Sequence, residues 1–261
     1  MSTQRWAVVT GASSGIGAAF ARALDARGWS LLLVARRRDR LDALARTLRR
    51  AEVLPADLGD EAEVARVAAH ALALGDVELL VNNAGFATNG EFLALDGARE
   101  LDMVKLNAVT PLVLAQQLVP AMVARRSGGV INVSSIAAFQ PVPYMATYGA
   151  TKAFLLSWSE ALAHELRSTG VRVTCVCPGP TATEFFEVAA VDPMMARMPH
   201  TMSADDVVAR TLDAFADGRA VLVPGLVNWL TAFVTRIFPR LVIRVVTGGL
   251  FKPRERKALR S

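Results

Sequence analysis

Residues Thr10–Gly17 read TGASSGIG and lie between a short apolar run, Trp6–Thr10, and an alanine-rich run from about Ile16 to Arg27. An apolar run, a glycine cluster and a helical run in this order are typical of the first strand, turn and helix of a βαβ unit. Glycines allow a tight turn and a close approach of the backbone to a pyrophosphate, and the helix N-terminus offers free N–H donors. The stretch therefore predicts a dinucleotide-binding loop.

The alternation of apolar strands and helices continues along the chain. Further strands are predicted at residues 30–35, 53–57, 78–83, 129–134, 171–176 and 220–223. Helices are predicted at residues 39–50, 61–74, 98–126, 148–169 and 204–216, with Pro111 interrupting the longest. Continuous apolar strands separated by helices indicate a parallel sheet that is covered on both faces. We therefore predict an α/β fold, a Rossmann-like doubly wound parallel β-sheet in a single domain, with a C-terminal helical extension.

The net charge of +5 is concentrated at the C-terminal end of the chain. Residues 236–261 carry eight basic residues and one acid, so residues 1–235 carry 21 basic and 23 acidic side chains. This distribution argues against a nucleic-acid-binding face on the body of the protein. No linker divides the chain, and we predict one domain over residues 1–225 and an amphipathic, basic extension over residues 226–261.

The sequence offers no pattern for a metal site, a disulfide framework or export. His70, His164 and His200 lack metal-ligand spacing, so no metal is predicted. Cys175 and Cys177 alternate along a strand, which predicts two small buried side chains on one face. The N-terminus lacks the basic and then apolar layout of a signal peptide. We therefore expect a protein of the reducing cytoplasm.

The residues that follow the second strand bear on the choice of cofactor. An acid at this point would bond both hydroxyls of an adenosine ribose and would repel a 2′-phosphate. The chain has Ala35 there, followed by Arg36-Arg37-Arg38, and guanidinium groups bind phosphate bidentately. The pattern favours NADP over NAD. The alternative is a solvated basic start of a helix, because arginine supplies 25 of the 29 basic residues.

Tyr148 and Lys152 stand four residues apart at the start of a predicted helix, and hence on one face of it. A nearby ammonium group stabilises a phenolate and lowers the pKa of a tyrosine, which is normally near 10. We therefore predict that Tyr148 acts as an acid or a base near neutral pH.

Together with the glycine loop, the segment Tyr148-Gly-Ala-Thr-Lys152 resembles the short-chain dehydrogenase/reductase family. The resemblance covers about residues 5–225. Further matches in family order are Asp57, Asn82-Asn83-Ala84-Gly85, Asn107, Ser135 thirteen residues before Tyr148, and Pro178-Gly179 followed by Thr183. This sequence departs from the family at Ala138, where glycine is frequent, and at Thr151, where serine is usual.

The resemblance implies hydride transfer between a nicotinamide and a carbonyl or alcohol. Tyr148 would exchange a proton with the substrate oxygen, and Ser135 would hydrogen-bond that oxygen. Lys152 would lower the pKa of Tyr148 and hold the nicotinamide ribose, and Asn107 would hold a water that relays protons to Lys152. The residues expected to contact NADP(H) are Gly11, Ser13, Ser14, Gly15, Ile16, Gly17, Arg36, Arg37, Asp57, Leu58, Asn83, Ala84, Gly85, Tyr148, Lys152, Pro178, Gly179, Thr181 and Thr183.

Residues 184–202 fall where the family has a lid over the substrate, and Met and Phe adapt well to irregular apolar ligands. The large apolar residues of this segment are Phe185, Phe186, Val188, Val191, Met194, Met195, Met198 and Met202. They favour a small hydrophobic carbonyl or alcohol substrate, although they would serve equally well to pack a lid onto the domain. Tyr144 is open to the same two interpretations.

The expected function is therefore that of an NADP-dependent oxidoreductase acting on CH–OH groups. Within enzymes, the alternatives are a 3-oxoacyl-thioester reductase and a hydroxysteroid-type dehydrogenase. From another class, the alternative is an NADP-binding module without turnover, although the residues matching the family's catalytic set are all present.

The extension has two interpretations. Arg236, Arg240 and Arg244 form one stripe on an otherwise apolar helix, which Pro239 should bend. Three arginines argue against a spanning helix, but an interfacial helix with a basic end fits an anionic membrane surface. The other interpretation is packing on a second subunit or over the active site. We favour the latter, because family members usually form dimers or tetramers.

Overall fold

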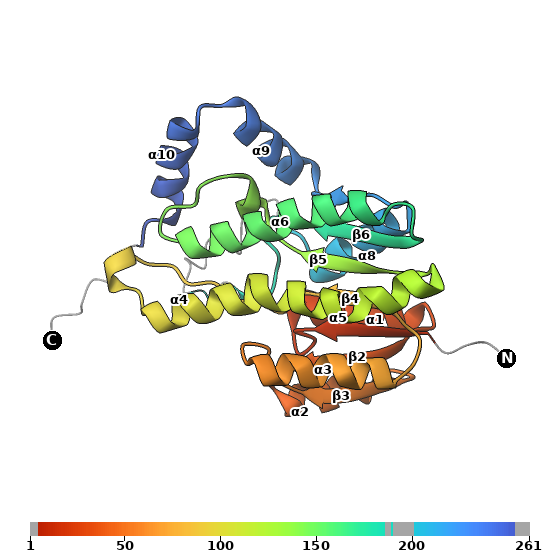
Figure 1. The fold of residues 1–261 in the computed structure, drawn as a ribbon. Coiled ribbons are helices and arrows are strands. Elements are labelled where there is room, and N and C mark those ends of the chain that lie inside the picture. Colours follow the sequence, from red (N-terminus) through yellow and green to blue (C-terminus); the bar gives the residue numbers. More distant parts are fainter. Residues whose placement is uncertain (1–4, 186–188, 190–200, 254–261) are drawn as a thin grey trace, which may run out of the picture.

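The computed structural model describes residues 5–185, 189 and 201–253 of the chain. Within them, seven strands form one sheet: β1 (Trp6–Thr10), β2 (Ser30–Ala35), β3 (Ala51–Pro55), β4 (Val77–Asn82), β5 (Gly128–Val133), β6 (Val171–Val176) and β7 (Val221–Leu222). Neighbouring strands are parallel, and their order is β3-β2-β1-β4-β5-β6-β7 (Figure 1). The predicted doubly wound parallel sheet is confirmed.

Helices cover both faces of this sheet (Figure 1). One face packs against α3 (Glu61–Ala73), α5 (Thr110–Arg125) and α6 (Ala146–Leu166). The other packs against α1 (Gly15–Ala26), α2 (Arg38–Ala45) and α8 (Ala204–Ala216). The remaining described helices are η1 (Phe92–Ala94), α4 (Gly97–Val104), η2 (Lys105–Val109), η3 (Ile136–Phe139), α9 (Leu226–Ile237) and α10 (Arg240–Phe251).

Successive strand residues point into two hydrophobic cores. Val8 and Leu32 belong to the core beneath α3, α5 and α6. Val9 and Leu33 belong to the core beneath α1, α2 and α8, and all four side chains are fully buried. Because both faces of the sheet are covered, the strands need apolar residues at every position, which explains their continuous apolar runs.

The long helical region predicted at residues 98–126 is not interrupted at Pro111. Pro111 lies in the first turn of α5, where a missing N–H group is tolerated. The irregularity lies just before it, in the π-helical turn η2. This wider turn carries Asn107, and π-helical turns occur frequently at functional sites.

Several other predicted elements differ in extent from the observed ones, β3 and α2 among them. The strand predicted at residues 53–57 begins and ends two residues earlier, as β3. The helix predicted to reach residue 50 ends at Ala45, because Thr47 bonds back to the carbonyl of Leu44 and closes a turn there. Arg49 then binds the carboxylate of Asp25 on α1 with its backbone N–H and its side chain.

Residues 97–125 form a helical stretch whose length and mean hydropathy of 1.4 would suffice to cross a membrane. Its second part, α5, lies on the sheet and buries Leu114, Leu118 and Met122 in the core. This stretch is therefore a core helix of the domain. The prediction for the cysteines is confirmed, since Cys175 and Cys177 are both buried and unbridged in one cluster.

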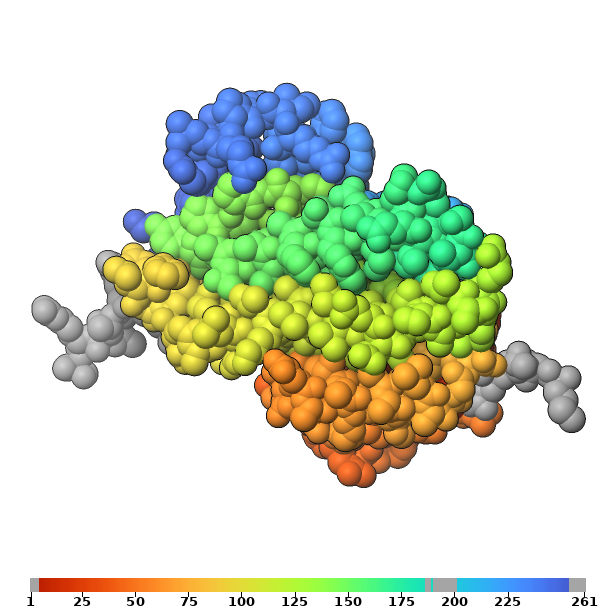
Figure 2. Space-filling model, in the orientation of Figure 1, coloured from red at the N-terminus to blue at the C-terminus, as the bar shows by residue number. Residues whose placement is uncertain are grey.

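The extension folds as two helices and not as the single bent helix that we expected. Pro239 has extended backbone angles and separates α9 from α10, which meet at an angle (Figure 1) and rest against the body of the domain (Figure 2). Arg236 lies over the ring of Phe139, 5.5 Å from its centroid, whereas Arg240 and Arg244 belong to α10. The arginines therefore do not form one stripe.

The buried sheet should be sensitive to the loss of side-chain volume. We expect Leu32→Ala, at a fully buried position, to lower the free energy of unfolding by about 2–5 kcal/mol, because it leaves a cavity in the core. The same change at Leu93, which is 95% exposed, should alter it by less than about 0.5 kcal/mol. Urea unfolding followed by circular dichroism measures both, and equal effects would contradict this assignment of the core.

Candidate active site

A cavity of about 410 Å³ opens at the carboxyl ends of the strands, next to the point where the strand order reverses between β1 and β4. Ligands of open α/β sheets bind in this position. Every residue predicted to contact the cofactor lines the cavity except Gly17. Ser135, Tyr148 and Lys152 line it as well, whereas Asn107 lies behind its wall.

The glycine loop forms one end of the cavity. Gly11 and Gly15 have φ angles of +65° and +54°, in the left-handed region that favours glycine. A Cβ atom on Gly17 would stand 2.2 Å from the carbonyl oxygen of Gly11. Gly17 is therefore needed for the close packing of α1 against the loop, and it does not itself face the cavity.

Thr10 joins the end of β1 to the end of β4. The residue is 2% exposed, and its hydroxyl donates to the carbonyl of Val81 and accepts from the backbone N–H groups of Asn83 and Ala84. The side chain of Asn83 donates back to the carbonyl of Thr10 at 2.9 Å. These bonds fix the segment after β4 beside the glycine loop.

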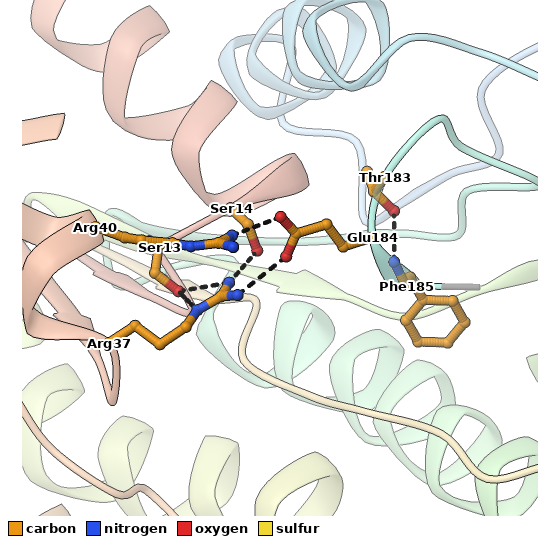
Figure 3. A network of polar contacts seen from close by, with 7 residues as sticks. All are labelled: Ser13, Ser14, Arg37, Arg40, Thr183, Glu184 and Phe185. Atoms are coloured by element: carbon orange, nitrogen blue, oxygen red, sulfur yellow. Dashed lines mark hydrogen bonds and ion pairs between the residues drawn. The ribbon is translucent and has the colours of Figure 1, made fainter. Parts of the chain in front are cut away.

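The arginines after β2 do not act alike. Arg37 lies on the glycine loop, with its Nε and Nη2 atoms 3.3 and 3.2 Å from the hydroxyl of Ser13 and Nη2 2.8 Å from that of Ser14 (Figure 3). Arg36 extends toward solvent and stands 3.9 Å from Asp57. The cavity thus has a cationic end at Arg37 and Ser13, suited to a phosphate group.

Glu184 also belongs to this end, and the sequence analysis missed it. Its carboxylate accepts from Arg37 at 3.0 Å and from Arg40 at 2.5 Å (Figure 3). The hydrogen bond from Arg40, and to a smaller extent that from Arg37, holds the pKa of Glu184 below its usual value. The only signal in the sequence was an acid directly after Thr183, and nothing local connects it with the arginines.

Tyr148 and Lys152 lie together in the first turns of α6, 7% and 5% exposed. Burial raises the pKa of Tyr148 to about 12, although a hydrogen bond with Ser135 acts in the opposite direction. Burial lowers the pKa of Lys152 to about 8, because the charged form is desolvated. The expected lowering of the Tyr148 pKa toward neutrality is therefore not found.

The geometry gives the reason. The ammonium of Lys152 donates to the carbonyl of Val133 at 2.8 Å and stands 5.8 Å from the centre of the Tyr148 ring. The loss of water around the buried phenol therefore outweighs the attraction of a phenolate to this ammonium.

Asn107 supports the site from the π-helical turn η2. Its amide donates to the carbonyl of Phe86 at 2.9 Å and to the hydroxyl of Thr151 at 3.2 Å, and its oxygen accepts from the N–H of Phe86. Thr151 in turn donates to the carbonyl of Tyr148. Asn107 thus connects the segment after β4 with the start of α6, and its expected role in a water relay stays a prediction.

The end of the cavity beyond Tyr148 is apolar. Val142, Met145 and Phe185 line it, and the ring of Phe185 lies 5.5 Å from that of Tyr148. Phe251, at the end of α10, lines it too, although the sequence analysis did not connect the extension with the site. Tyr144 does not line the cavity.

Most of the predicted lid cannot be placed against this end. Phe186, Val188, Val191, Met194, Met195 and Met198 lie outside the described residues. Met202, which is described, packs with the core on the α8 side of the sheet.

The extension also contacts the segment Pro178-Gly179, which lines the cavity. A Cβ atom on Gly179 would stand 2.1 Å from the side-chain oxygen of Asn228, so α9 lies directly against this segment. The amide nitrogen of Asn228 donates to the carbonyl of Pro224 at 2.8 Å.

Among the described residues, no group of His, Cys, Asp or Glu is arranged to hold a metal ion.

The chain resembles known proteins over most of its length. A model of the short chain dehydrogenase family matches residues 5–192. A short-chain dehydrogenase from Sphingobium yanoikuyae, solved in complex with NADPH, is 34% identical and superposes with a TM-score of 0.81, over 97% of this chain and 98% of that one.

Two curated relatives are longer than this chain. Hydroxysteroid dehydrogenase-like protein 1 of Gallus gallus is 34% identical over 72% of this chain and 59% of its own length. A very-long-chain 3-oxoacyl-CoA reductase of Podospora anserina is 38% identical over 66% of this chain and 53% of its own length. The chain thus spans only a little over half of these two proteins.

The buried lysine predicts a pH dependence of stability. Between about pH 8 and about pH 10 the folded chain has released the Lys152 proton that the unfolded chain still holds, so stability should rise with pH. We expect Lys152→Met to remove this rise and the exposed Lys105→Met to preserve it. Urea unfolding at several pH values measures the effect, and an unchanged pH profile in Lys152→Met would contradict the burial of a titrating ammonium.

Proposed function

This chain belongs to the short-chain dehydrogenase family, and on that premise we propose that it is an NADP(H)-dependent oxidoreductase that reduces hydrophobic carbonyl compounds to alcohols. The observation that carries the proposal is the arrangement of one cavity with three regions. The glycine loop and Arg37 form its cationic end, Tyr148 with Ser135 and Lys152 its reactive centre, and apolar side chains its far end.

The residues present fit NADP(H). The N-terminus of α1, with the glycines before it, suits the pyrophosphate, and the Arg37–Ser13 pair suits a 2′-phosphate. Ala35 leaves no acid at the end of β2 to repel that phosphate. The NADPH in the Sphingobium relative supports the same cofactor. When bound, NADP(H) supplies or accepts the hydride.

The protein residues supply the proton and the orientation. Because the pKa of Tyr148 is raised to about 12, its hydroxyl keeps its proton at neutral pH and can give it to the oxygen of a carbonyl that is being reduced. Ser135, which hydrogen-bonds Tyr148, would donate to the same oxygen and stabilise its developing charge. Lys152, whose ammonium stands 5.8 Å from the centre of the Tyr148 ring, would hold the ribose hydroxyls.

The apolar end of the cavity supports a hydrophobic substrate. Phe185, Met145, Val142 and Phe251 offer no charged group to a ligand beyond Tyr148. Long 3-oxoacyl thioesters and steroids would both suit such a lining, and the names of the two curated relatives point to these classes. The free, buried Cys175 and Cys177 support work in the reducing cytoplasm.

The extension supports an oligomer. Large apolar side chains of α9, α10 and the turn between them are 40–73% exposed, more than a monomer usually leaves in one patch. They are Leu226, Val227, Trp229, Leu230, Phe233, Val234, Ile237, Phe238, Leu241, Val242, Val245, Val246 and Leu250. We propose that a second copy of the chain covers them, and an anionic membrane surface is the alternative.

Turnover of NADPH with hydrophobic ketones and 3-oxoacyl thioesters tests the reaction. We expect Tyr148→Phe to lower kcat/KM by at least about 100-fold, because the proton donor is lost, and still to bind NADPH. Tyr144→Phe removes the only other tyrosine hydroxyl, outside the cavity, and should leave turnover unchanged. A preference for NADH would contradict the assignment of Arg37 to a 2′-phosphate.

The stacked, half-exposed rings of Trp229 and Phe233 allow a test of the extension. We expect the double variant Trp229→Ser/Phe233→Ser to shift sedimentation equilibrium toward the monomer, because it removes apolar contact area. Leu72→Ser, on the exposed side of α3, should not do so. An unchanged oligomer combined with lost flotation on anionic vesicles would favour the membrane alternative.

A further inference from the structure

Glu184 connects two walls of the cofactor cavity that are far apart in the sequence. It lies on the segment that follows β6, and its partners Arg37 and Arg40 lie at the start of α2, across the cavity (Figure 3). Each carboxylate oxygen binds a different arginine, Oε2 at 3.0 Å and Oε1 at 2.5 Å. One side chain thus holds the two walls together.

Arg37, one of the two arginines that bind Glu184, also belongs to the cationic end of the cavity. Arg37 uses Nη1 for Glu184 and turns its Nε and Nη2 atoms toward Ser13 and Ser14. A guanidinium group can bind one anion at each edge, so a 2′-phosphate at the Ser13 side leaves the Glu184 contact in place. Arg40 adds a second positive charge, which keeps the cluster cationic beside one carboxylate.

Glu184 is also linked to the reactive centre, through Phe185, its neighbour in the chain. Glu184 stands between Thr183 and Phe185, and the N–H of Phe185 bonds the hydroxyl of Thr183 at 3.4 Å. Phe185 packs against the hydrophobic cluster that includes Val142 and Tyr148, and its ring lies 5.5 Å from that of Tyr148. A displacement of Glu184 would therefore move the apolar side chain that lies against Tyr148.

We propose that Glu184 is a positioning residue for the substrate: its ion pairs with Arg37 and Arg40 hold residues 183–185 across the cavity, so that Phe185 forms a fixed apolar wall beside Tyr148. The inference rests on the proposed function, since it assigns Phe185 to the substrate end of that site. It adds a specificity determinant that does not itself touch the reacting atoms.

An ordinary exposed ion pair would contribute little, because solvent screens it and long side chains lose entropy in forming it. This carboxylate differs in two respects. It binds two cations at once, and their hydrogen bonds, most of all the one from Arg40, hold its pKa below the usual value. Both arginines lie more than 140 residues away in the chain, so the contact fixes tertiary structure and not a local turn.

The test compares Glu184→Gln with the wild type, using NADPH and two ketones, one bulky and apolar and one small enough not to reach Phe185. We expect KM for the bulky ketone to rise about three- to tenfold, the range that one or two ion pairs can supply. kcat should change less than about twofold, because Tyr148, Ser135 and Lys152 remain in place. KM for the small ketone should stay the same.

Two further variants and a control complete the design. Arg40→Gln, at a residue that does not line the cavity, should reproduce the effect, and the double variant Glu184→Gln/Arg40→Gln should be no worse than either single one. Glu184→Asp should restore part of the wild-type KM. Glu165→Gln, an exposed carboxylate on α6, controls for the loss of a surface charge and should match the wild type.

A measurement without cofactor separates this inference from the proposed function. Amide hydrogen exchange of the peptide containing residues 183–185 should be faster in Glu184→Gln than in the wild type, whatever reaction the protein catalyses. Unchanged exchange together with an unchanged KM would overturn the inference. Tighter NADPH binding by Glu184→Gln with an unchanged KM would also overturn it, because Glu184 would then only compete with the 2′-phosphate for Arg37. A wild type that neither binds nor oxidises NADPH would refute the proposed function instead.

Discussion

The buried hydroxyl of Thr10 is the interaction on which the site depends most directly. It ties the end of β1 to the end of β4, the two strands between which the strand order reverses. The crossovers lead in opposite directions from this point, so the carboxyl ends of β1 and β4 leave a crevice that no helix fills. This crevice is lined by residues of the glycine loop, of the segment around Asn83 and of the start of α6.

Burial determines the chemistry of the centre more than the Tyr–Lys spacing does. The same desolvation raises the pKa of Tyr148 and lowers that of Lys152, because it penalises the charged form of each group. Tyr148 therefore keeps its proton at neutral pH, whereas Lys152, with a pKa of about 8, is still largely charged there and gives up its proton more readily than an exposed lysine. A protonated phenol is the state that a carbonyl reduction requires of its proton donor.

The C-terminal extension is part of the site and part of the surface at once. Asn228 of α9 lies against Gly179, and Phe251 of α10 lines the apolar end of the cavity. The same two helices also expose large apolar residues to solvent. A partner bound to these apolar residues would therefore contact the same two helices that pack against Gly179 and line the apolar end of the cavity.

The sequence by itself determined the sheet, the glycine loop and the Tyr148–Lys152 pair. These follow from local rules: apolar runs specify buried strands, glycine permits positive φ, and a spacing of four places two side chains on one helix face. Only the tertiary structure decided that Glu184 meets Arg37 and Arg40, that Phe251 reaches the cavity, and that burial raises the pKa of Tyr148. Each of these depends on contacts between residues far apart in the chain or on the exclusion of water, and neither is encoded in local spacing.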